Sequence, residues 1–155
     1  GRWPLEIARV DVASIAQAVV DEHGGRAFSR RITLDLGFGE PALARADAAA
    51  VRRILTNLVC NALTYTAEGG TVRVDVTEEE GAVVALVRDS GIGFTPEESR
   101  RAGIPFQRFD RSGSVTGGGL GIAIAMGLAR RMGGAMRLAS EPGAGSAMEL
   151  RLPKA

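Results

Sequence analysis

Apolar positions at helical spacing predict three helices in this chain. The first begins after Asp11, a candidate N-cap, and is expected to end at about Glu22, ahead of Gly24-Gly25. The clearest apolar stripe covers about residues 48–65, directly after a second capping aspartate. A third apolar helix pattern covers about residues 120–132 and ends before a pair of glycines.

Alternating polar and apolar positions predict the strands. The segments with this spacing are residues 31–36, 42–46, 71–77, 82–88, 135–140 and 146–152. Tight turns join several of these strands in pairs, while helices separate the pairs. The pattern therefore favours a two-layer α/β sandwich with a mixed sheet over a doubly wound parallel sheet.

Composition limits the class of protein. The length of 155 residues fits one domain, and 45% hydrophobic with 24% charged residues is typical of a globular chain. No apolar run reaches the roughly 18 residues of a spanning helix, and no signal peptide is recognisable. The single Cys60 excludes an internal disulfide, and no Cys/His cluster surrounds it to hold zinc. We therefore expect a cytoplasmic domain.

Charge and glycine content narrow the chemistry. A net charge of +1 from 19 basic and 18 acidic residues gives no electrostatic footprint for nucleic acid. Because Lys154 is the only lysine, a phosphate-binding loop that ends in Gly-Lys is absent. The 21 glycines are about twice the usual share of roughly 7%. Many lie between Gly91 and Gly145, and residues 89–119 are long for a connection unless they form a functional loop.

Three short segments carry candidate chemistry. Asn57 and Asn61 are four residues apart, so their amides share one face of the long helix, where an amide oxygen can ligate Mg²⁺. The alternative is two ordinary surface amides. Asp89 follows a strongly apolar strand, where its carboxylate can accept from an exocyclic amine such as that of adenine. Gly91 and Gly93 would permit close approach of a ring, although an ordinary Asp-Ser-Gly turn remains the alternative.

The third segment is a glycine cluster that leads into a helix. Residues 117–121 read Gly-Gly-Gly-Leu-Gly, so free backbone N–H groups and the positive end of the helix dipole converge there. This arrangement suits a polyphosphate without any lysine. A flexible hinge is the alternative.

Taken in order, these segments resemble the motifs of the catalytic and ATP-binding domain of bacterial sensor histidine kinases, in the GHKL superfamily. Residues 57–62 resemble the N box, residues 89–93 the G1 box and residues 117–121 the G2 box. Pro105-Phe106 falls at the F box, and residues 142–146 resemble the closing glycine motif. The resemblance covers roughly residues 11–153.

The resemblance implies a five-stranded mixed sheet under three helices, the Bergerat fold, with ATP between the long helix and a lid at about residues 94–117. It implies that Asn61 holds Mg²⁺, that Asn57 contacts phosphate or metal, and that Asp89 binds the adenine amine. The other nucleotide-binding candidates that it implies are Tyr65, Gly91, Gly93, Phe106, Arg108, Gly117, Gly119, Leu120 and Gly121. Tyr65 also fits a core tyrosine, and Arg108 and Arg111 also fit plain solvated charges.

The chain departs from the family at three places. Thr64 stands where an N box often has lysine, so a cationic phosphate contact is missing. Gly103 replaces the first F-box phenylalanine. No phosphoacceptor motif surrounds His23, the only histidine, so we expect His23 to have a surface or capping role.

The residue at position 57 separates kinase from hydrolase. Relatives that hydrolyse ATP carry a glutamate there as general base, whereas an amide cannot take a proton near neutral pH. Neutral imidazole is already a nucleophile, so positioning and charge neutralisation suffice to phosphorylate histidine. We therefore expect Mg-ATP binding and transfer of the γ-phosphoryl group to a histidine. The alternatives are a degenerate, non-catalytic interaction module and an ATP hydrolase.

The expected partners follow from the same resemblance. They are a dimerisation and phosphoacceptor domain of the same kinase, absent from this chain, and a response regulator. Residues 1–10 are interpreted as a tail or link to that domain, and residues 11–155 as the catalytic domain. The chain would then be an excised fragment of a two-component sensor and monomeric on its own.

Overall fold

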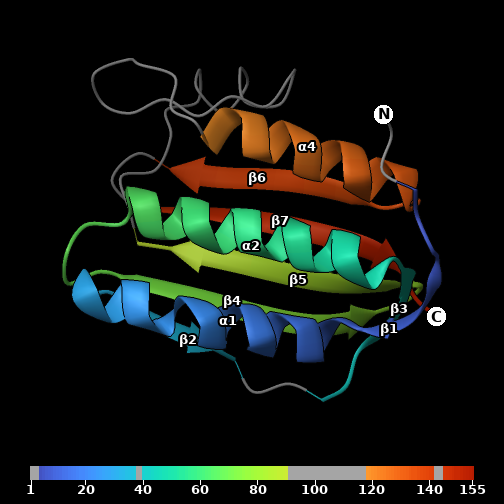
Figure 1. Ribbon diagram of the computed structural model, residues 1–155, viewed down its shortest axis with the longest axis horizontal. Helices are drawn as coiled ribbons and strands as arrows, with labels where there is room; N and C mark the ends of the chain where they lie inside the picture. The colour runs from blue at the N-terminus through green and yellow to red at the C-terminus, as the bar shows by residue number, and fades with distance from the viewer. Residues whose placement is uncertain (1–3, 38–39, 91–117, 142–144) are drawn as a thin grey trace.

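The computed structural model describes residues 4–37, 40–90, 118–141 and 145–155 (Figure 1). The helices are α1 (Val12–Ser29), α2 (Ala48–Tyr65) and α4 (Gly118–Arg131). The strands are β1 (Ala8–Asp11), β2 (Thr33–Leu36), β3 (Leu43–Ala46), β4 (Thr71–Glu79), β5 (Ala82–Asp89), β6 (Ala135–Glu141) and β7 (Gly145–Pro153). Each predicted helix and strand is therefore present in the described part of the chain.

Five strands form one mixed sheet in the order β2-β4-β5-β7-β6. The β2 strand runs parallel to β4, and the other neighbours are antiparallel. Figure 1 shows α1, α2 and α4 side by side across one face of this sheet. The predicted two-layer sandwich, with a five-stranded mixed sheet and three helices, is confirmed.

The core lies between the helices and the sheet, and α2 is its centre. The α2 side chains Ile54, Leu55 and Leu58 are fully buried, and each contributes about 1.5–3 kcal/mol by burial of apolar surface. Asp47 caps α2, as expected, because its Oδ1 accepts from the Ala50 N–H at 2.8 Å. The most regular sequence pattern thus produces the most buried helix.

The predicted end of α1 is wrong. The helix continues through Gly24-Gly25 to Ser29, although each glycine inside a helix costs about 1 kcal/mol relative to alanine. The last turns are held by tertiary contacts instead, since Ala27 is only 2% exposed. Arg30 also donates to the Thr66 carbonyl oxygen at 3.1 Å. Packing therefore overrides a local signal that ends many helices.

The pattern predicted no element in residues 1–10, yet the structure has a strand there. The β1 strand pairs with β3 in an antiparallel two-stranded sheet. Ahead of it, the Glu6 N–H donates to Asp47 Oδ2 at 2.7 Å. Asp47 therefore binds the segment before β1 with one oxygen and caps α2 with the other.

Asp11 caps α1 and also holds the start of the β3 segment. Its Oδ1 accepts from the backbone N–H groups of Ala13 and Ala42 at 3.1 and 3.0 Å, and its Oδ2 accepts from the Ser14 hydroxyl at 2.8 Å. Burial opposes ionisation of this carboxyl, but the hydrogen bonds from Ala42, Ser14 and Ala13 outweigh it and lower the pKa below the ordinary 3.8. The ionised form of Asp11 therefore stabilises the fold.

We expect Asp11→Ala to lower the free energy of unfolding by about 1–2 kcal/mol at neutral pH. Because the folded pKa is depressed, this contribution is present above the ordinary value of 3.8 and is lost as pH falls through the lower folded value. Urea unfolding from about pH 6 down to about pH 2 should show the two proteins converging only at the acid end. A difference that stays constant down to about pH 2 would contradict this role.

Candidate functional site

Three elements meet at one end of the domain. Figure 1 shows the C-terminal end of α2, the end of β5 and the N-terminal end of α4 at the same side of the molecule. The start of β7 lies there too, because Asp89 at the end of β5 pairs in register with Ser146. The candidates Asn57, Asn61 and Asp89 thus come from elements that the fold brings together.

Asn61 is not a surface amide. Its side chain is buried, with 5% exposure, and its Nδ2 finds no hydrogen-bond partner among the described residues. A buried polar group without a partner costs about 1–3 kcal/mol, so the fold retains this amide at the expense of stability. Asn57, one turn earlier, is half-buried. A buried polar side chain of this kind is typical of a residue that binds a ligand.

Asp89 is the last residue of β5 and is half-buried. The hydroxyl of Ser146, itself 7% exposed, donates to Asp89 Oδ2 at 2.7 Å. This bond fixes the orientation of the carboxylate at the edge of the site. Sequence reasoning missed the role of Ser146; the available signal was a polar residue that opens the last strand in the closing glycine motif.

Gly145 allows β7 to approach Asp89 closely. Its φ is +90°, a region that favours glycine, and a Cβ there would collide with the carbonyl oxygen of Asp89. Glycine is therefore required at position 145, both by the backbone conformation there and by the close approach of Asp89.

A second close approach lies at the end of α2. A Cβ on Gly70 would lie 2.5 Å from Thr66 Cγ2 and 2.8 Å from Ser90 Oγ. The Thr66 side chain is 1% exposed, and its hydroxyl has no hydrogen-bond partner among the described residues. The amide of Asn61 and the hydroxyl of Thr66, both buried and unpartnered there, thus lie within one and a half turns of each other.

The described residues contain no group of three His, Cys, Asp or Glu side chains able to hold a metal ion. A magnesium ion would therefore depend on the Asn61 amide, on water and on phosphate oxygens supplied by a nucleotide. Rotation of the amide by about 180° exchanges its oxygen and nitrogen, so the unpartnered end can present an oxygen. The residues present fit a metal that arrives with its nucleotide.

The N-terminus of α4 supplies backbone donors. The helix begins at Gly118, two residues before the predicted start, so Gly119, Leu120 and Gly121 lie in its first turn. The first four N–H groups of a helix have no partner within it, and they suit an anion. Tyr65, the last residue of α2, is half-buried at the same end of the domain.

The remaining candidates lie outside the described residues. They are Gly91, Gly93, Phe106, Arg108, Arg111 and Gly117, together with the expected lid at about residues 94–117.

His23 lies within α1, so it does not cap the helix. Its Nδ1 is 2.7 Å from the Val19 carbonyl oxygen, and its Nε2 is 3.3 Å from Cys60 Sγ on α2. The Nδ1–H therefore donates to Val19, and Nε2 can accept from the thiol. This half-buried imidazole connects α1 to α2.

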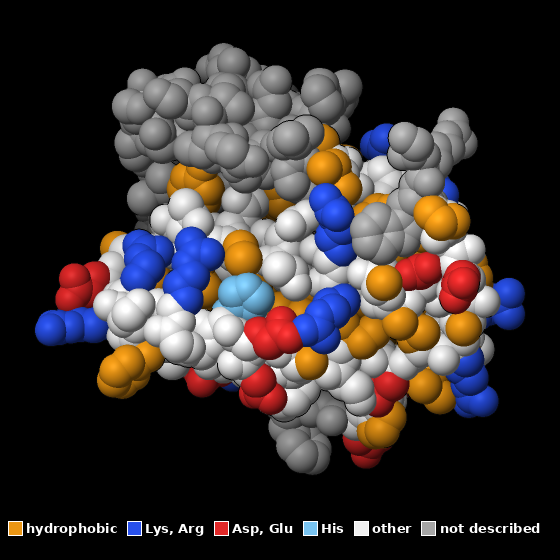
Figure 2. Space-filling model, in the orientation of Figure 1, with side chains coloured by type: hydrophobic (Ala, Val, Ile, Leu, Met, Phe, Trp, Pro, Cys, Tyr) orange, Lys and Arg blue, Asp and Glu red, His pale blue; other side chains and the backbone are white. Residues whose placement is uncertain are grey.

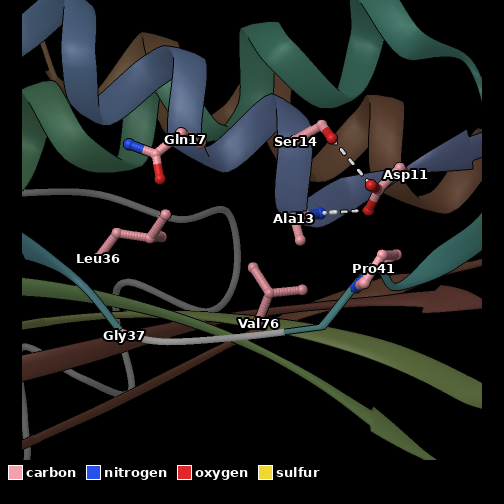
Figure 3. Close-up of a pocket in the computed structure, with 8 residues that line it drawn as sticks. All are labelled: Asp11, Ala13, Ser14, Gln17, Leu36, Gly37, Pro41 and Val76. Atoms are coloured by element: carbon pink, nitrogen blue, oxygen red, sulfur yellow. Dashed lines mark hydrogen bonds between the residues drawn. The ribbon is translucent and has the colours of Figure 1, made fainter.

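A cavity of about 480 Å³ lies elsewhere, between the start of α1 and the sheet (Figure 3). Asp11, Gln17, Leu36 and Val76 are among the residues that line it. None of the nucleotide-binding candidates in the described part of the chain is among the residues that line this cavity, so it is separate from those candidates. Among the described residues, no helix is long and apolar enough to cross a membrane.

Comparison with known proteins identifies the family. Residues 46–155 match the family described as "Histidine kinase-, DNA gyrase B-, and HSP90-like ATPase". The histidine protein kinase DivJ of Caulobacter vibrioides is 37% identical over 109 residues, covering 70% of this chain and 18% of DivJ. The sensor histidine kinase MtrB of Mycolicibacterium paratuberculosis is 36% identical over 155 residues, covering 96% of this chain and 27% of MtrB. The chain thus spans less than a third of these relatives.

Solved structures agree. Full-length ShkA in complex with AMPPNP has a TM-score of 0.83 and 29% identity, covering 100% of this chain and 32% of the ShkA chain. The mycobacterial sensor histidine kinase MprB has a TM-score of 0.73 and 29% identity, covering 96% of this chain and 98% of that chain. The catalytic domain of ThkA, at 21% identity and a TM-score of 0.81, supports the fold. This chain belongs to the histidine kinase-, DNA gyrase B- and HSP90-like ATPase family, as the ATP-binding catalytic domain of a sensor histidine kinase.

Proposed function

We propose that this domain binds Mg-ATP and transfers the γ-phosphoryl group to a histidine on a dimerisation and phosphoacceptor domain of the same kinase. The observation that carries the proposal is the buried amide of Asn61, whose Nδ2 has no hydrogen-bond partner among the described residues. It lies at the same end of the domain as the oriented Asp89 carboxylate and the N-terminus of α4.

Each group has a role that follows from its chemistry. Asp89, oriented by Ser146, accepts from the exocyclic amine of adenine. The first-turn N–H groups of α4 bind phosphate oxygens. Asn61 ligates Mg²⁺ through its amide oxygen, and Asn57 contacts phosphate or metal. A bound Mg²⁺ would neutralise charge that develops on the phosphates.

The transfer itself needs no base from this domain. A neutral imidazole nitrogen attacks the γ-phosphorus, the bond from that phosphorus to the β–γ bridging oxygen breaks, and ADP leaves. Asn57 cannot accept a proton from water, which disfavours hydrolysis. We propose that the amide at position 57, which cannot act as a general base, lets the domain discriminate between histidine and water.

The partners in this proposal are the phosphoacceptor domain and a response regulator. Because the chain spans less than a third of DivJ or MtrB, the rest of a whole kinase has room for a phosphoacceptor domain. We propose that the catalytic domain alone is a monomer.

The test uses Asn61→Leu. Removing this buried amide should leave the free energy of unfolding unchanged or raise it by about 1 kcal/mol, while Mg²⁺ should no longer strengthen ATP binding. Unfolding in urea and calorimetric titration with ATP, with and without Mg²⁺, measure the two effects. In a protein that includes the phosphoacceptor domain, the same change should abolish acid-labile phosphohistidine.

Cys60→Ala, one residue away on the side of α2 that contacts His23, serves as the control and should keep Mg-ATP binding. ATP binding without any phosphohistidine in the larger protein would instead favour the non-catalytic interaction module. Steady ATP turnover that Asn57→Ala abolishes would favour a hydrolase.

A further inference from the structure

The C-terminal ends of α1 and α2 share a group of basic side chains. Figure 2 shows basic side chains gathered where these two helix ends lie side by side, and they are arginines, because the only lysine of the chain, Lys154, lies elsewhere. Within it, Arg26 Nη2 donates to Thr64 Oγ1 at 2.9 Å, a contact between residues 38 positions apart. The Arg26 guanidinium, which comes from α1, is thereby held against the last turn of α2.

The Thr64 hydroxyl is a fixed acceptor. Its own proton is committed, because Thr64 Oγ1 donates to the Cys60 carbonyl oxygen at 2.8 Å. A lone pair of Thr64 Oγ1 therefore accepts from Arg26. Because the hydroxyl is neutral, it positions the guanidinium without cancelling the positive charge of Arg26. One hydrogen bond occupies one of the five N–H donors of an arginine, so the others remain for a ligand.

Among the described residues, no carboxylate forms an ion pair with Arg26. Arg30 is likewise held by a neutral group, the Thr66 carbonyl oxygen, but two other arginines nearby are paired with carboxylates. Arg31 pairs with Glu68 at 3.3 Å, and Arg52 on α2 pairs with Glu22 on α1. An arginine held in place without a counter-charge is suited to bind an anion that arrives from solution.

Arg26 lies close to the candidate site through its contact with Thr64 on α2. Thr64 follows Asn61 by three residues and Asn57 by seven, spacings that place all three on one side of α2. The last turn of α2 has no basic residue of its own. The single lysine, Lys154, does not supply this charge, because it pairs with Glu78 at 3.4 Å and its backbone forms a β-bridge with Ala44 in β3.

We propose that Arg26, positioned by Thr64, is a binding residue for the phosphate chain of ATP. The inference rests on the proposed function, and it assigns a role to a helix that lies outside the matched family region, residues 46–155. The hydrogen bond to Thr64 places a positive charge at the last turn of α2, which has no basic residue of its own. Adenine recognition at Asp89 does not involve this charge.

The experiment is calorimetric titration of the chain and of Arg26→Gln with Mg-ATP, Mg-ADP and adenosine. We expect Arg26→Gln to weaken ATP binding about tenfold and ADP binding less, and to leave adenosine binding unchanged. The loss should shrink at high salt, since the phosphate contact is exposed to solvent. The double variant with Arg26→Gln and Thr64→Lys should recover most of the ATP affinity, because it returns a cation from α2 itself.

Arg31→Gln removes the same charge five residues further along, beyond the end of α1, and should change ATP binding less than about twofold. Equal weakening of ATP and adenosine by Arg26→Gln, or failure of Thr64→Lys to restore binding, would show a structural role and overturn the inference. ATP binding that is unchanged in Arg26→Gln would overturn it while leaving the proposed function intact. No ATP binding by the unchanged chain would overturn both.

Discussion

Asp89→Asn should weaken Mg-ATP binding on the order of 100-fold, equivalent to about 3 kcal/mol. The side chain keeps its shape, but one of its two acceptor oxygens becomes an NH₂ donor. If the amide oxygen continues to accept from Ser146, the NH₂ group faces the adenine amine, and two donors oppose each other. If the amide rotates, the bond from Ser146 is lost instead. Calorimetric titration measures the change.

Inosine triphosphate (ITP) has a carbonyl in place of the adenine amine. Binding of ITP therefore distinguishes a loss of adenine recognition from a general disruption of the site. The side-chain amide of Asp89→Asn can donate to that carbonyl, so the variant should bind ITP at least as well as ATP. The unchanged protein should prefer ATP. A variant that loses both nucleotides equally would point to a disturbed site, and one that binds ATP normally would exclude Asp89 from adenine recognition.

The sequence could predict the elements whose burial follows a simple period. The long helix was predictable within a residue at each end, because Asp47 is a strong N-cap and its apolar stripe is continuous. The β4–β5 hairpin was predictable because strand spacing continues up to the turn at Gly81. These signals are local, and the tertiary structure reinforces them.

The end of α1 and the β1 strand were not predictable in this way. The α1 helix passes through Gly24-Gly25 because its last turns pack against α2, a contact that no local window contains. The β1 strand has four residues and no clear period, and it exists because β3 pairs with it. In both places a distant partner decides the local structure.

In the candidate site too, some features could be predicted from the local sequence and others depend on distant contacts. The order of the motifs predicted which residue types are present, namely two helix amides, a carboxylate at a strand end and a glycine-rich helix start. It did not predict that Asn61 is buried and unpartnered among the described residues, that Ser146 orients Asp89 from 57 positions away, or that Arg26 lies on Thr64. Those properties depend on which elements the sheet places side by side.

Gly145→Ala should have the largest effect on stability, a loss of about 3–5 kcal/mol in the free energy of unfolding. Two costs combine at this position. A φ of +90° strains any residue with a Cβ, and that Cβ would also collide with the Asp89 carbonyl oxygen in the paired strand. Because β5 and β7 lie inside the sheet, each with a strand on both sides, neither backbone can move without breaking ladder hydrogen bonds. Urea unfolding measures the loss.

Gly69→Ala separates the two costs. Gly69 has nearly the same backbone angle, φ +86°, but a Cβ added there would meet nothing within 4 Å among the described residues, so its loss should be only about 1–2 kcal/mol. A similar loss for both variants would show that the collision at Gly145 is relieved at little cost. If the collision instead pushes β7 away from β5, the Ser146 hydroxyl leaves Asp89. The folded fraction of Gly145→Ala should then bind ATP more weakly, whereas Gly69→Ala should bind it normally.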